Sequence, residues 1–77
     1  MIDEFTSRGS VRLKVRDAIA HIRLDRPDRL NALDSTMAHD LADVVEELVA
    51  RADVRVIVIG GEGRAFCAGN ELTPFAA

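Results

Sequence analysis

The sequence has few of the residues that stabilise small domains by covalent or metal cross-links. Its 77 residues include one cysteine, two histidines, no tryptophan and no tyrosine. A single cysteine excludes an internal disulfide, and His21 and His39 have no companion at metal-ligand spacing. A chain of about 60 residues buries only about 60% of its unfolded surface. We therefore expect an adequate core, a partner chain, or membership of a larger protein.

Long apolar runs and basic clusters are also missing. The longest mainly apolar run, residues 54–60, contains Arg55 and is far shorter than the roughly 20 residues that span a bilayer. The first ten residues include Asp3, Glu4 and Arg8 and show no apolar signal region. With a lone thiol, this predicts a reducing, cytoplasmic location and no membrane association. Thirteen acidic against ten basic side chains argue against nucleic-acid binding.

The first half of the chain predicts a hairpin. Residues 1–9 are polar and show no period, which indicates a flexible tail. From Ser10 onward Val11, Leu13 and Val15 alternate with basic residues, a pattern typical of a half-buried strand. A second run covers residues 18–24, and a turn at residues 16–17 would join the two runs as an antiparallel hairpin.

The second half predicts a helix and one more strand. Pro27 ends the hairpin, and Asp34, Ser35 or Thr36 can cap a helix over residues 36–51 whose apolar side chains recur at helical spacing. Residues 54–59 are apolar on both faces, which predicts a strand covered on both sides. The order of elements indicates an α/β fold.

Three stretches together resemble the start of a crotonase-superfamily protein of the enoyl-CoA hydratase/isomerase family. They are IRLDRPDRLNAL at residues 22–33, DVRVIVIGG at 53–61 and GRAFCAGNEL at 63–72. The resemblance implies a ClpP/crotonase-like ββα spiral, truncated to its first strands, one helix and the oxyanion-hole loop. Residues 10–77 would then be the N-terminal part of one incomplete crotonase-like domain, preceded by the tail at 1–9.

The resemblance also implies a site. The backbone N–H of Asn70 would be one of two donors to a thioester oxygen, and the second donor and the catalytic carboxylates would lie beyond Ala77. The sequence departs from the family pattern at Asn70, where alanine is common, and at Glu71, where aspartate is usual. The substrate-binding positions implied are Arg29, Leu30, Ala32, Ala68, Gly69 and Asn70.

The residues of the proposed site and several of their neighbours also have purely structural interpretations. The loop at 66–72 can be a tight strand-to-helix connection, and Arg29 can be a solvated charge. Asn31 is expected to hold its turn through its side chain, and Cys67 to act as a small buried hydrophobe. The acidic residues of the helix, among them Asp40 and Glu47, are expected to form a solvated face.

The activity implied is hydration of a 2-enoyl-CoA, or a related reaction through a thioester enolate. The family implies an acyl-CoA substrate, no metal, no redox cofactor, and homotrimers or pairs of trimers. We expect the isolated 77-residue chain to be inactive. The alternative is a truncated non-catalytic chain that binds a CoA-like ligand weakly or has a structural or interaction role.

Overall fold

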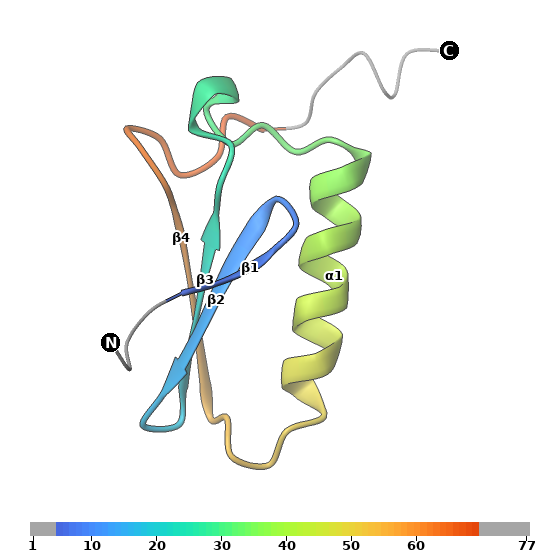
Figure 1. The fold of residues 1–77 in the computed structure, drawn as a ribbon, viewed down its shortest axis with the longest axis vertical. Coiled ribbons are helices and arrows are strands. Elements are labelled where there is room, and N and C mark those ends of the chain that lie inside the picture. Colours follow the sequence, from blue (N-terminus) through green and yellow to red (C-terminus); the bar gives the residue numbers. More distant parts are fainter. Residues whose placement is uncertain (1–4, 70–77) are drawn as a thin grey trace.

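A computed structural model describes residues 5–69, which form one four-stranded sheet covered on one face by a helix (Figure 1). The strands lie in the order β1-β2-β3-β4. The elements, in chain order, are β1 (Thr6–Arg8), β2 (Val11–Arg16), β3 (Ile19–Leu24), the 3₁₀ helix η1 (Pro27–Arg29), α1 (Ser35–Val49) and β4 (Val56–Gly61).

The predicted hairpin is β2 and β3, which pair antiparallel from Val11↔Leu24 to Arg16↔Ile19. Its turn lies one residue later than expected. Asp17 and Ala18 both have positive φ, at 53° and 67°. Two-residue hairpin turns favour positive φ at both positions, because the twist of such a turn then matches the right-handed twist of the strands. Ala18 therefore belongs to the turn and not to the strand.

The expectation of a flexible tail over residues 1–9 is wrong at β1. Thr6–Arg8 pairs antiparallel with β2, from Thr6↔Leu13 to Arg8↔Val11. Three residues with two exposed side chains carry no alternation of apolar and polar positions. The strand forms because the free edge of β2 offers backbone partners.

The helix α1 begins one residue before the predicted start and ends two residues before the predicted end. Asp34 is the cap, and its carboxylate accepts a hydrogen bond from the Met37 N–H at 2.8 Å. The core lies between one face of α1 and one face of the β2–β3 hairpin. Its buried residues are Met37, Val44 and Leu48 of α1 and Val11, Leu13, Ala20, Ile22 and Leu24 of the sheet.

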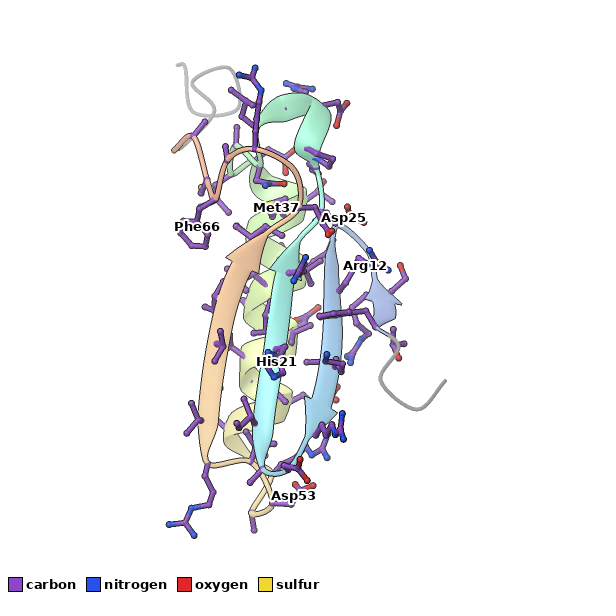
Figure 2. The ribbon with its side chains drawn as sticks, turned by 90° about the vertical axis from the view of Figure 1, so that its left-hand side faces the viewer. Arg12, His21, Asp25, Met37, Asp53 and Phe66 are labelled. Atoms are coloured by element: carbon purple, nitrogen blue, oxygen red, sulfur yellow. The ribbon has the colours of Figure 1, made fainter. Side chains whose placement is uncertain are left out.

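The prediction that residues 54–59 are buried on both sides is wrong for the described part of the chain. The strand β4 lies at the edge of the sheet, parallel to β3, and α1 covers only one face. Val56 and Val58 are 50% and 46% exposed, and they pair in register with Ile19 and His21. Figure 2 views this uncovered face, with His21 in front of the sheet and α1 behind it.

The parallel arrangement of β3 and β4 brings two loops together. Both strands finish at the same end of the sheet, Leu24 beside Gly61. The segment between β3 and α1 and the segment after β4 therefore meet there (Figure 1).

Candidate functional site

The first half of the candidate site is the turn at residues 26–33, which follows β3. Pro27 opens η1, and the N–H groups of Leu30 and Asn31 donate to the carbonyls of Pro27 and Arg26 at 3.1 and 2.9 Å. Leu30 and Asn31 both have left-handed φ, at 52° and 56°. Two consecutive left-handed residues reverse the chain, so that residues 30–33 run back across the end of the sheet.

The second half is the loop at residues 62–69, which follows β4. Its first residue, Glu62, donates its N–H to the Leu24 carbonyl at 2.8 Å. At its far end the Ala68 N–H donates to the Leu30 carbonyl at 3.0 Å, and the Leu33 N–H donates to the Gly69 carbonyl at 2.8 Å. Backbone hydrogen bonds thus attach the loop to β3 and to the turn.

The structure brings together several of the predicted substrate-binding residues. Leu30 and Ala68 are joined directly by a backbone hydrogen bond, and the Ala32 N–H donates to the Arg29 carbonyl at 3.0 Å within the turn. Arg29 is exposed at the end of η1, and Leu30 and Ala32 are half-buried. Asn70, the predicted oxyanion donor, lies outside the described residues.

The backbone of the loop is open to an approaching molecule at its far end. Ala68 and Gly69 are exposed, and a Cβ built on Gly69 would meet nothing within 4 Å. Gly69 has φ 107°, a conformation that favours glycine. Small side chains at 67–69 leave the main chain accessible, as a site that uses backbone N–H groups requires. Cys67, expected to be buried, is half-buried and packs against the core.

Two acidic residues of α1, Asp40 and Glu47, bind residues of the β1–β2 hairpin. Asp40 accepts hydrogen bonds from the Ser10 N–H and hydroxyl, both at 2.8 Å, and these bonds lower the pKa of its carboxyl group. Glu47 pairs with Arg8 at 2.6 Å, and this hydrogen-bonded pair lowers the pKa of Glu47. Both contacts fasten the β1–β2 hairpin to α1. That these carboxylates are not catalytic stays a prediction.

A surface hollow of about 280 Å³ lies between the β1–β2 hairpin and α1, away from the turn and the loop. Its lining includes Arg8 and Asp40, which already pair with Glu47 and Ser10. Among residues 5–69 no three His, Cys, Asp or Glu side chains gather as a metal site would need. No helix in the same range is long and apolar enough to cross a membrane.

The sequence did not predict the structural roles of Gly61, which ends the motif at residues 53–61, and of Glu62. Gly61 lies where β4 meets the loop, and a Cβ there would be 2.5 Å from the Phe66 carbonyl oxygen. Glu62 forms ion pairs with Arg23 at 3.1 Å and Arg12 at 3.9 Å. A double glycine after a strand is a signal for close backbone approach; nothing in the sequence marks the partners of Glu62.

Comparison with known proteins agrees with this geometry. The family model described as "Enoyl-CoA hydratase/isomerase" matches residues 14–77. A "Probable enoyl-CoA hydratase" from Rhodobacter capsulatus is 41% identical over 71 residues, which are 92% of this chain and 27% of that protein. A "Hydroxycinnamoyl-CoA hydratase-lyase" from Pseudomonas fluorescens is 33% identical over 66 residues, 86% of this chain and 24% of that protein.

Solved structures share the fold. An enoyl-CoA hydratase from Thermoplasma volcanium superposes with a TM-score of 0.78 at 38% identity, over 88% of this chain and 27% of that one. An enoyl-CoA hydratase/isomerase from Mycobacterium paratuberculosis gives 0.82 at 35% identity, over 92% and 28%. The chain thus spans about a quarter of the length of these relatives, and the sheet and helix α1 formed by residues 5–69 correspond to part of the crotonase fold. The chain belongs to the enoyl-CoA hydratase/isomerase family.

Proposed function

We propose that this chain is the N-terminal segment of an enzyme that adds water to 2-enoyl-CoA thioesters, and that the loop after β4 supplies one donor of its oxyanion hole. The observation that carries the proposal is the backbone pairing of residues 68–69 with residues 30–33. This pairing fixes the direction of the main chain at the exposed end of the loop.

The direction of the Gly69 carbonyl supports a role for the next N–H. That carbonyl accepts a hydrogen bond from Leu33, so it faces the turn. In a trans peptide the C=O and the following N–H point in opposite directions. We therefore propose that the next N–H, that of Asn70 outside the described residues, donates to a thioester oxygen that gains negative charge.

The turn supplies the other proposed substrate contacts. We propose that Arg29, an exposed residue, meets a phosphate of CoA as a charge-assisted donor, and that Leu30, Ala32 and Ala68 lie along the path of the thioester arm. Addition of water breaks the C=C π bond, forms a C–O bond to the hydroxyl group and a C–H bond to the proton, and is redox-neutral, so we propose no cofactor beyond the CoA of the substrate. The second N–H donor and the proton-transferring carboxylates would come from parts of the protein outside residues 5–69, in a homotrimer or a pair of trimers.

The rival proposal is a non-catalytic chain that binds CoA weakly or serves as an interaction module. Its support is that the chain spans only about a quarter of the length of the relatives it matches. The two proposals are separated by hydration of crotonyl-CoA, followed as loss of the absorbance of the conjugated thioester. We expect turnover by a complete enzyme that carries this segment and none by the 77-residue chain. Turnover by the isolated chain within a few-fold of the complete enzyme would contradict our assignment.

The role of Asn70 is tested by two substitutions in the complete enzyme. Asn70→Pro removes the N–H and is expected to lower kcat by about 10²–10³, the usual effect of deleting one oxyanion donor. Asn70→Ala keeps the N–H and is expected to keep kcat within about tenfold. Circular dichroism must show that both variants fold. A folded Asn70→Pro variant with near-normal kcat would remove this N–H from the mechanism.

A further inference from the structure

Asn31 is a polar side chain that is completely buried, with 0% of its surface exposed. Its amide oxygen accepts a hydrogen bond from the Arg26 N–H at 2.7 Å. Its amide nitrogen donates to the carbonyls of Glu62 and Ala65, at 2.9 and 2.8 Å. Both amide hydrogens are thus used, which is the complete donor capacity of an asparagine.

These three hydrogen bonds connect two segments that are more than 30 residues apart in the sequence. The bond to Arg26 lies within the turn, and the two bonds to Glu62 and Ala65 reach across to the loop. The same loop is attached to the turn a few residues later through Ala68. The Asn31 amide therefore links the turn to the loop through its side chain and fixes the position of the loop relative to the turn.

The backbone of Gly61 lies close against the Asn31 amide. A Cβ at Gly61 would be 2.8 Å from the Asn31 amide nitrogen and 2.6 Å from the Ala65 carbonyl oxygen. The left-handed φ of 56° at Asn31 is one that asparagine adopts more readily than most residues. Buried polar side chains with every hydrogen bond satisfied hold a single geometry, because an unpaired group in the interior is costly.

We propose that Asn31 is a positioning residue for the loop at residues 62–69. Its amide group holds the carbonyls of Glu62 and Ala65, and with them the segment that leads to the proposed oxyanion donor. This inference rests on the proposed hydratase function. Asn31 itself does not touch the substrate and acts only through the loop.

The substitution Asn31→Asp separates the two halves of this role. The side chain keeps its shape and its acceptor for the Arg26 N–H, so the turn is retained. The two N–H donors are replaced by an oxygen that faces the Glu62 and Ala65 carbonyls, so the loop is released. A misplacement of about 1 Å can lower a catalysed rate by about 10²-fold. We expect kcat to fall 10- to 100-fold with KM changed less than about fivefold.

The matched control is Asp40→Ala, which removes the contact of α1 with Ser10 and leaves the turn and the loop unchanged. Both variants are examined in the complete enzyme by crotonyl-CoA kinetics and by amide hydrogen exchange. The reporting amides are Leu33 and Ala68, whose N–H groups bond turn to loop. We expect their exchange to rise at least tenfold in Asn31→Asp and to stay unchanged in Asp40→Ala, with kcat of the control within about threefold of wild type.

The outcomes are distinguishable. A normal kcat in Asn31→Asp, or an equal loss of kcat in both variants at equal loss of thermal stability, would overturn the positioning role. Unchanged exchange at Leu33 and Ala68 would overturn it as well. If the wild-type enzyme does not hydrate crotonyl-CoA, the proposed function fails, and exchange alone then decides whether Asn31 holds the loop.

Discussion

Replacing Gly61 with alanine tests how tightly β4, the turn and the loop are packed together. A Cβ at this position would lie 2.5 Å from the Phe66 carbonyl oxygen, 2.6 Å from the Ala65 carbonyl oxygen and 2.8 Å from the Asn31 amide nitrogen. Distances below 3.0 Å are essentially never adopted by real Cβ atoms. Two of the three atoms belong to the backbone, so the loop itself must move.

The adjacent Gly60 supplies a matched control, because a Cβ there would meet nothing within 4 Å. Overpacking a well-filled site costs about 1–3 kcal/mol, whereas alanine in place of glycine inside a strand gains about 0.5–1 kcal/mol. We therefore expect Gly61→Ala to lower the free energy of unfolding by about 1–2 kcal/mol. Gly60→Ala should leave it unchanged or raise it by up to about 1 kcal/mol.

Urea unfolding of the complete enzyme measures both variants, and crotonyl-CoA kinetics follow the site. Because the clash falls on the backbone of the proposed oxyanion loop, kcat of Gly61→Ala should fall at least tenfold, and kcat of Gly60→Ala should remain within about twofold. Equal stability and equal kcat in the two variants would show that the loop yields freely. In that case Gly61 would not be closely packed against the loop in solution.

Three further predictions concern other parts of the chain. The Ser10 hydrogen bonds lower the pKa of Asp40. Their contribution to stability is therefore complete above the ordinary aspartate pKa of about 3.9 and is lost as the pH falls through the lower pKa of the folded state. The difference in unfolding free energy between wild type and Asp40→Asn should shrink over that pH range, and a constant difference would contradict this prediction. Ala18→Gly should raise the free energy of unfolding by about 0.5–1 kcal/mol, because a left-handed alanine costs about 1–2 kcal/mol; urea unfolding would instead show a loss if the turn were not left-handed in solution. The isolated 77-residue chain should self-associate through the exposed apolar face of β4. Sedimentation should show less self-association in Val58→Lys. A monodisperse wild-type monomer would show that this face does not drive association.

The elements with strong local patterns could be predicted from the sequence. The apolar period of α1 and the capping residue Asp34 mark the helix because both signals lie within the helix itself. The alternation in β2 and β3 likewise indicates the hairpin. The strand β1 has no such signal, since its partners lie on β2 and its side chains are polar. Prediction failed where the structure depends on contacts between distant residues.

The candidate site shows the same division. The family motifs at residues 22–33 and 63–72 place the turn and the loop, and parallel pairing of β3 with β4 explains why they meet. The sequence suggests that Asn31 holds its own turn, and the bond to Arg26 confirms this. Its two bonds to the loop were not predictable, because a local pattern carries no information on residues 31 and 34 positions away.

The failure at β4 is informative in a different way. Apolar residues on both faces of a strand are typical of a strand covered on both sides, yet α1 covers one face only and Val58 remains 46% exposed. The relatives with this fold are several times longer than the 77 residues here. The pattern of apolar residues in a strand reflects all the contacts that the strand makes, and one short segment supplies only some of them. The apolar outer face of β4 is therefore where additional structure is expected to pack, while the turn and the loop at its end already hold each other in place through Asn31.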